Sequence, residues 1–171
     1  MKICRITQKS LGLMDDILPE IVKKRYWDPG CFTIGAVTEE GEKGRASLVG
    51  VCQFVIGSTK KGNVFAVVTY IYVYSDYRRL GVGRALMDKA CSILREVGVS
   101  YCLSILLEDE AKTLGYRIAT EEIADFLETQ GFVHSKEAYT SWPDAVKYLF
   151  KGIPGISIKD PKWYIRKTMG V

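Results

Sequence analysis

The sequence predicts a mixed α/β domain in which a central, mostly antiparallel sheet is flanked by helices. Two observations lead to this prediction. Up to residue 74, apolar segments rich in β-branched and aromatic residues alternate with short polar or glycine-containing turns, which is typical of an antiparallel meander. From residue 83 onward, helical and strand patterns follow one another, and such an order places helices against the sheet.

Four strands are predicted in the first half of the chain. They cover residues 2–7, 31–38, 47–56 and 64–74. Between the first two, residues 14–26 have a helical pattern that Pro19 interrupts, either by opening a new helix or by kinking the first.

The clearest predicted helix covers residues 83–97, because apolar residues recur there every three or four positions. Gly98 ends it, and a strand at 101–107 precedes a second helix that runs from the N-cap Thr120 to Gln130. The remaining predicted elements are strands at 132–134 and 162–168 and a helical turn at 142–150. The last strand pairs either within the chain or with a second copy in a homodimer.

Length and composition indicate one domain over residues 1–171. Hydrophobic residues make up 47% of the 171 positions and charged residues 26%, which suits a globular fold with a sizeable core. The longest apolar run is too short to cross a bilayer, and residues 1–5 lack the apolar stretch of a signal peptide. We therefore expect a cytoplasmic protein that does not associate with membranes.

The cysteines and the single histidine argue against a disulfide framework and against a metal site. There are five cysteines, an odd number, and none forms a C-x-x-C pair with another. His134 is the only histidine, so the usual zinc ligand sets are missing. We expect reduced thiols in the core and no bound metal.

The junction between the predicted strand at residues 64–74 and the predicted helix at residues 83–97 has the composition of an anion site. Arg78-x-x-Gly81-x-Gly83 leaves backbone N–H groups without side-chain shielding where a helix begins, and such a turn attracts phosphate. Basic Arg79 and Arg84 lie beside it. A later segment is acidic through Glu108, Asp109, Glu110, Glu121, Glu122, Asp125 and Glu128. One part of the molecule thus suits a phosphate and another suits an amine.

Other phosphate-binding and nucleic-acid-binding motifs fit this segment poorly. The dinucleotide fingerprint needs a third glycine where this chain has Leu86, and no Gly-Lys-Ser/Thr follows as a P-loop requires. A recognition helix carrying Arg78, Arg79, Arg84 and Lys89 would lack the second helix of a helix-turn-helix. We therefore expect no nucleic-acid partner.

The segment resembles the GNAT superfamily of N-acetyltransferases, whose motif Arg/Gln-x-x-Gly-x-Gly/Ala binds the pyrophosphate of acetyl-CoA. The resemblance covers essentially the whole chain and is most specific over residues 67–87. It implies a GNAT-like fold whose sheet is splayed at the cofactor strand, with acetyl-CoA as co-substrate. It also implies transfer of the acetyl group to a primary amine of a small molecule, peptide or protein by direct attack, without a covalent enzyme intermediate.

By the same resemblance, two sets of residues would hold acetyl-CoA. The backbone of the strand before the turn would bond the thioester carbonyl and the pantetheine amides through Ile71, Tyr72, Val73 and Tyr74, with Val73 the first choice for the carbonyl. The pyrophosphate would be wrapped, mainly by main-chain N–H groups, at Arg78, Arg79, Leu80, Gly81, Val82, Gly83, Arg84 and Ala85.

The acid and base of the resembled family are replaced in this chain. Leu127 stands where many members have the tyrosine that protonates the leaving thiolate, and Val67 stands where some have a basic glutamate. Glu108 is the candidate base, and Tyr116 or Tyr139 are alternative acids. Because a thiol of pKa about 8.5 leaves as thiolate at modest cost, loss of the tyrosine slows the reaction without forbidding it. The alternative is an acyl-CoA-binding sensor domain that has lost catalysis.

Overall fold

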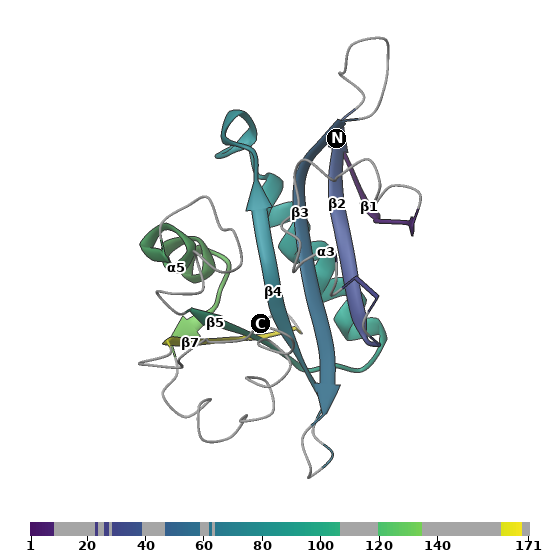
Figure 1. Ribbon diagram of the computed structural model, residues 1–171. Helices are drawn as coiled ribbons and strands as arrows, with labels where there is room; N and C mark the ends of the chain where they lie inside the picture. Colours follow the sequence, from purple (N-terminus) through teal and green to yellow (C-terminus); the bar gives the residue numbers. More distant parts are fainter. Residues whose placement is uncertain are drawn as a thin grey trace.

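A seven-stranded mixed sheet organises the part of the chain that the computed structural model describes, namely residues 1–8, 23, 26–27, 29–38, 47–58, 62, 64–106, 120–134 and 162–168 (Figure 1). Its strands are β1 (Lys2–Arg5), β2 (Cys31–Thr38), β3 (Ser47–Ser58), β4 (Val64–Val73), β5 (Tyr101–Leu106), β6 (Val133–His134) and β7 (Lys162–Lys167). They lie in the order β1-β2-β3-β4-β5-β7-β6. Only β4 and β5 are parallel, which confirms the predicted mixed, mostly antiparallel sheet.

The predicted strands are confirmed, with ends that differ by a residue or two. The last strand pairs within the chain, because β7 lies between β5 and β6. It therefore does not need a second copy to complete the sheet. The helical segments predicted at 14–26 and 142–150 lie almost wholly or wholly outside the described residues.

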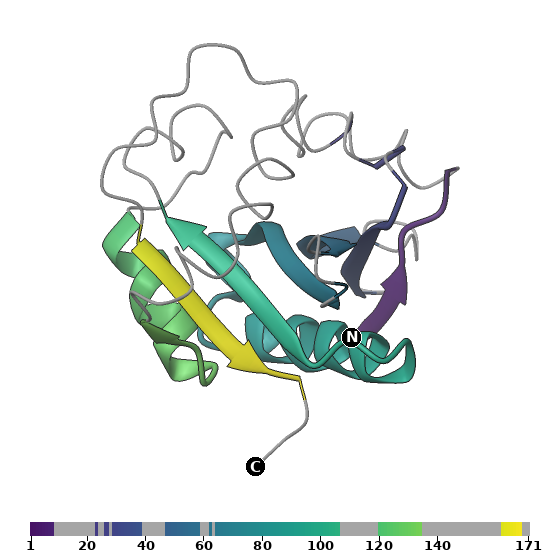
Figure 2. The ribbon, with the colours of Figure 1, turned by 90° about the horizontal axis from the view of Figure 1, so that it is seen from below.

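Two helices and a short 3-10 turn complete the described elements. The 3-10 turn η3 (Ser75–Tyr77) links β4 to α3 (Val82–Glu96), and α5 (Thr120–Thr129) precedes β6. Figure 2 shows α3 and α5 on the same side of the sheet. Among the described residues, no helix is both long and apolar enough to span a membrane.

Both helices end as their glycines predict. After α3, the N–H of Gly98 donates to the carbonyl of Arg95 and that of Val99 to the carbonyl of Leu94. After α5, the same pair of hydrogen bonds recurs: the N–H of Gly131 donates to the carbonyl of Glu128, and the N–H of Phe132 donates to the carbonyl of Leu127. Gly98 and Gly131 both have a positive φ, 80° and 84°, which glycine adopts without steric cost.

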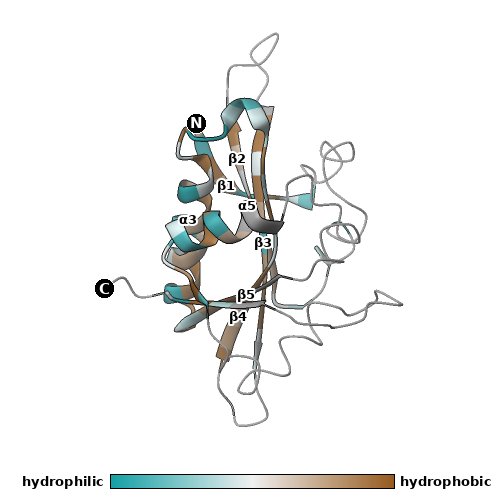
Figure 3. Cartoon of the chain, turned by 90° about the vertical axis from the view of Figure 1, so that its left-hand side faces the viewer, coloured by the Kyte–Doolittle hydropathy of each residue, from teal (hydrophilic) through white to brown (hydrophobic). Residues whose placement is uncertain are grey.

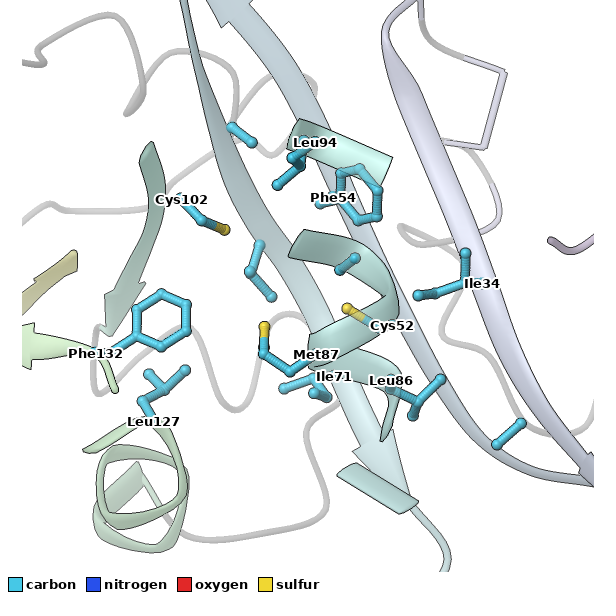
Figure 4. Close-up of a cluster of buried hydrophobic side chains, with 14 of the residues drawn as sticks. Ile34, Cys52, Phe54, Ile71, Leu86, Met87, Leu94, Cys102, Leu127 and Phe132 are labelled. Atoms are coloured by element: carbon cyan, nitrogen blue, oxygen red, sulfur yellow. The ribbon is translucent and has the colours of Figure 1, made fainter. Parts of the chain in front are cut away.

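The main core lies between the sheet and the two helices. The buried face of α3 consists of Val82, Leu86, Met87, Ala90, Cys91 and Leu94. In Figure 4, Leu94 lies beside Phe54 of β3, Leu86 lies toward Ile34 of β2, and Met87 lies beside Ile71 of β4, while Leu127 of α5 lies beside Phe132. Hydropathy follows the same division: brown dominates the strands in Figure 3, whereas α3 and α5 also carry teal segments.

The opposite face of the sheet carries a second buried cluster, made of Ile6, Val51, Tyr70 and Tyr72. The rings of Tyr70 and Tyr72 are stacked with centres 6.4 Å apart, and Tyr74 meets Tyr72 edge-on at 5.6 Å. Alternate residues of β3 and β4 therefore serve two different cores. This double burial explains why both strands read as nearly continuous apolar runs.

Candidate active site at the opened edge of strand β4

The central strands β4 and β5 separate part of the way along the sheet. Their parallel pairing comprises Ala66 with Cys102 and Val67 with Leu103. Beyond these pairs β5 continues along β7 as far as Leu106, while β4 continues along β3 as far as Val73. In the described part of the chain, β4 thus has no strand partner on its β5 side after Val67, which leaves an edge open inside the sheet.

A β-bulge lies where the separation begins. Gln53 of β3 pairs with Tyr70, and the next residue, Phe54, pairs with Val68, so Thr69 is an extra residue on β4. A bulge bends its strand and increases the local twist. Because Thr69 comes two residues after the last β4–β5 pair, the bend turns β4 away from β5 at this point.

The direction of each backbone group along the opened edge follows from the pairing with β3. The N–H of Tyr74 donates to the carbonyl of Val49 at 3.0 Å, so Tyr74 points its backbone groups toward β3. In an antiparallel ladder this direction alternates, which turns Tyr72 toward β3 as well. Ile71 and Val73 consequently point their N–H and C=O groups toward the opened edge. Of the four residues predicted on this strand, these two offer backbone groups to a ligand.

The Arg78 side chain ties the turn back to the end of β4. Its Nε donates to the carbonyl of Val73 at 2.8 Å, and its guanidinium carbon lies 5.4 Å from the centre of the Tyr72 ring. The Val73 carbonyl is thus already bonded, and its N–H remains directed at the opened edge. Arg78 was predicted beside the pyrophosphate, and that remains a prediction; what the structure shows is that Arg78 braces the strand.

The glycine turn places N–H groups that have no helical acceptor at the start of α3. Gly81 is the N-cap and has φ 83°, and Arg79 has φ 61°, a value uncommon for a residue with a side chain. The first bond within α3 runs from the N–H of Ala85 to the carbonyl of Gly81 at 2.9 Å. The N–H groups of Val82, Gly83 and Arg84 precede that bond and have no helical acceptor. Such a helix start attracts anions.

The surroundings of the turn are open and basic. A Cβ built on Gly81 would meet no atom within 4 Å, so nothing in the described chain fills the space beside it. Arg79 and Arg84 are exposed, and the first turn of α3 carries no acidic residue. A negatively charged group therefore meets only favourable charges among these residues.

The two glycines of the motif have separate functions. Gly81 needs its left-handed backbone conformation, whereas Gly83 needs its missing side chain. A Cβ on Gly83 would lie 2.8 Å from Cε2 and 3.0 Å from Cζ of Phe126, so Gly83 lets α5 approach the start of α3. The exposed N–H groups were predicted from both glycines, but the packing role of Gly83 could not be seen in the motif.

Comparison with known proteins identifies the family. A model described as the Acetyltransferase (GNAT) family matches residues 3–116. The chain belongs to the GNAT acetyltransferases. This confirms the resemblance, and with it an acyltransferase that takes its acyl group from an acyl-CoA. No curated protein matches the chain in sequence.

Solved structures share the fold of this chain at low sequence identity. A GNAT family acetyltransferase from Staphylococcus aureus Mu50 has a TM-score of 0.62 and 14% identity, covering 98% of this chain and 99% of its own. GCN5 from Tetrahymena has a TM-score of 0.61 and 15% identity, covering 99% and 97%. An acetyltransferase from Thermus thermophilus has a TM-score of 0.60 and 14% identity, covering 98% and 97%.

Apolar side chains occupy the two positions for which the family resemblance implied an acid in many members and a base in some. Leu127 is fully buried in the main core, and Val67 is fully buried in the last pair between β4 and β5. Neither position can move a proton. Glu108, Tyr116 and Tyr139, the predicted substitutes, lie outside the described residues.

The three buried cysteines of this GNAT enzyme, Cys52, Cys91 and Cys102, are poor nucleophiles. Burial raises the pKa of the Cys52 thiol to about 12, with Cys91 close by, and it raises the pKa of Cys102 well above the usual range. Burial also raises the pKa of Cys91. A buried thiol that holds its proton cannot attack a thioester. Among the described residues, no three His, Cys, Asp or Glu side chains are grouped so as to hold a metal ion.

Proposed function

We propose that this chain, as one domain over residues 1–171, is an acetyl-CoA-dependent N-acetyltransferase. It transfers the acetyl group to a primary amine of a small molecule, peptide or protein by direct attack. One observation carries the proposal: the opened edge at Ile71 and Val73 leads through the Arg78 brace to the N–H groups of Val82, Gly83 and Arg84, which have no helical acceptor. A long ligand with amides at one end and a pyrophosphate at the other suits this run of donors and acceptors.

The residues of the chain would divide the binding of acetyl-CoA between them. The N–H groups at the start of α3, with Arg79 and Arg84 beside them, would hold the pyrophosphate. The backbone of Ile71 would bond the pantetheine amides in the way that it would bond a neighbouring strand. The Val73 N–H would donate to the thioester carbonyl oxygen, where negative charge develops as the amine attacks.

The chemistry needs a bond exchange and two proton movements. The acceptor nitrogen forms a bond to the carbonyl carbon, the carbon–sulfur bond breaks with its electron pair going to sulfur, and the protonated amine loses two protons, one before it attacks and one as the tetrahedral intermediate collapses. An amine with a pKa of about 10.4 must be deprotonated before it attacks, and Glu108 is our candidate for that step. Because Leu127 replaces the usual acid, we infer that the sulfur departs as a thiolate.

A second candidate function is an acyl-CoA-binding domain without turnover. The burial of Leu127 and Val67, the two positions of the missing acid and base, favours it. Both candidates use the same cofactor site and differ only in the reaction with an amine. A binding test therefore comes first, and a turnover test separates them.

The binding test is a thermal-shift titration with acetyl-CoA, coenzyme A and ATP. At about one hundred times Kd, binding adds about 2.7 kcal/mol, which raises Tm by roughly 5 to 10 °C for a domain of this size. Gly81→Glu should abolish the shift, because a carboxylate would stand among the N–H groups. No shift with either coenzyme A species in the native protein would overturn the proposal.

Gly98→Glu is the matched control for that variant. Gly98 also has a positive φ and open space around its Cβ position, but it lies at the other end of α3. Both variants should lose similar intrinsic stability, and only Gly98→Glu should keep the coenzyme A shift. Release of free thiol from acetyl-CoA in the presence of a panel of amines then separates the enzyme from the binding domain.

A further inference from the structure

Three polar side chains form a hydrogen-bonded line across the middle of the sheet. The Thr69 hydroxyl of β4 donates to the Gln53 Oε1 of β3 at 3.0 Å, and the Gln53 Nε2 donates to the Thr33 hydroxyl of β2 at 3.1 Å. Gln53 and Thr69 are 0% exposed and Thr33 is 2% exposed. We refer to these three residues as the polar line.

The polar line ends at Thr69, in the bulge where β4 turns away from β5 and the opened edge begins. Thr69 is the extra residue of β4, between Val68, which packs in the α3 core, and Tyr70, which packs on the opposite face. Gln53 lies two residues after Val51, so its side chain is on the same face as Tyr70. The Thr69 hydroxyl reaches Gln53 on that face, which places Thr69 and Tyr70 on one side of the sheet, as a bulge requires.

Buried polar groups constrain the register of the strands. An amide or hydroxyl buried without a partner is destabilising, whereas a paired one is tolerated. Shifting β4 by one residue to remove the bulge would move Thr69 away from Gln53 and leave both groups without this bond. The apolar residues of β4 also favour this register, because Tyr70 and Tyr72 pack on one face and Val68 and Ile71 on the other, and the polar line adds to that preference at the bulge itself.

We propose that Gln53 is a positioning residue for the acyl-transfer site. By bonding Thr69 and Thr33, it fixes the bulge, and the bulge sets the direction in which Ile71 and Val73 present their N–H groups at the opened edge. The inference rests on the proposed function, since it concerns how acetyl-CoA meets that edge. Gln53 itself lies three strand pairs away from Val73 and is buried, so it acts through Thr69.

The test compares two substitutions of Thr69 with a control elsewhere. Thr69→Val keeps the shape and removes the hydroxyl, while Thr69→Ser keeps the hydroxyl. Thr168→Val removes a second buried threonine hydroxyl, which donates to the Val99 carbonyl just past the end of β7, two strands away from β4. Affinity for coenzyme A by calorimetry and the KM for acetyl-CoA are measured for all of them and for the native protein.

The inference predicts a defect at the cofactor site that loss of stability does not explain. Thr69→Val should weaken coenzyme A binding and raise KM by about fivefold, the effect of one hydrogen bond. Thr69→Ser and Thr168→Val should bind as the native protein does, although Thr168→Val should lower Tm. Equal affinity of Thr69→Val and Thr168→Val would overturn the inference and leave the proposed function intact.

A measurement without the cofactor separates this inference from the proposed function. Amide hydrogen exchange in the ligand-free protein should be faster at residues 70–73 in Thr69→Val than in the native protein, and unchanged there in Thr168→Val. If the native protein fails to bind coenzyme A, the proposed function fails, yet the exchange data still show whether the line fixes the edge. Unchanged exchange at residues 70–73 in Thr69→Val would contradict the positioning role.

Discussion

Gly81 and Gly83 are two residues apart, and each is required for a different physical reason. Gly81 has a left-handed conformation that a side chain would strain, with open space where its Cβ would stand. Gly83 has an ordinary helical conformation but faces the Phe126 ring. A single motif therefore serves both ligand access and helix packing, and mutations at its two glycines should fail in different ways.

Arg78 allows a test of the brace between the turn and β4. Arg78→Met keeps much of the aliphatic stem and removes the donor to the Val73 carbonyl. It should lower Tm by roughly 2 to 4 °C, because a half-buried bond of this kind contributes about 1 kcal/mol, and it should also raise the KM for acetyl-CoA. The control is Arg84→Met, which removes an exposed charge from α3 and should leave Tm unchanged. Equal Tm values for the two variants would refute the brace.

Cys52 gives a pH dependence of stability with a defined sign. Burial raises its pKa from 9.0 to about 12, so above pH 9 the unfolded chain loses this proton before the folded chain does. Deprotonation of this thiol therefore stabilises the unfolded state relative to the folded state, and the free energy of unfolding falls as pH rises from 9 to 12. Between about pH 8 and about pH 10, Cys52 should account for a loss of about 1.4 kcal/mol.

Urea unfolding under reducing conditions tests this pH dependence. Cys52→Ala should be less stable than the native protein at about pH 8, because it leaves a small cavity, yet it should lose less stability on going to about pH 10. Cys91 and Cys102 contribute in the same direction in both proteins, since burial also raises their pKa values. Parallel pH profiles of the variant and the native protein would disprove the assignment to Cys52.

At the scale of elements, the contact between α3 and α5 joins the anion site to the rest of the fold. Phe126 meets Gly83 in the first turn of α3, and the adjacent Leu127 packs in the main core. Because α5 is held by Leu127, its Phe126 fixes how closely the second helix approaches the glycine turn. The close contact is possible only with a residue that lacks a Cβ.

A double-mutant cycle tests that contact. Gly83→Ala gains helix propensity but forces the Phe126 ring to move, and Phe126→Leu removes the ring that obstructs it. In urea unfolding, the double variant should be more stable than the sum of the single effects by about 0.5 to 3 kcal/mol. The same cycle with Gly98→Ala, at the far end of α3, should be additive. Additivity at Gly83 would show that the two side chains do not compete for space.

Local signals predicted the elements well, because each depends on nearby residues. Gly98 and Gly131 determine where the helices end, and the spacing of Leu86, Ala90 and Leu94 defines the buried face of α3. The opening between β4 and β5 was expected only by family resemblance. It depends on which strands pair and for how long, and an apolar run such as residues 64–73 carries no signal for the loss of one neighbour.

At the scale of the whole molecule, the sheet is covered on both faces, and the opened edge of β4 lies between two of its strands rather than at its border. The two buried clusters hold β3 and β4 from opposite sides, while the bulge at Thr69 turns the end of β4 away from β5. Gln53 of β3 and Thr69 of β4 are polar residues within otherwise apolar stretches of these strands, which the sequence alone shows. That they bond to each other and that Gln53 bonds to Thr33 could not be predicted without the register of three strands.

The most direct test of the account is the change in backbone amide NMR signals when acetyl-CoA is added to the native protein. We expect the largest changes at Ile71 and Val73 on the opened edge and at Val82, Gly83 and Arg84 at the start of α3. The amides of β1 and β2, three and two strands away, should change little. Saturable changes confined to other residues, or no changes at any concentration, would contradict the claim that this edge and this helix start form the acetyl-CoA site.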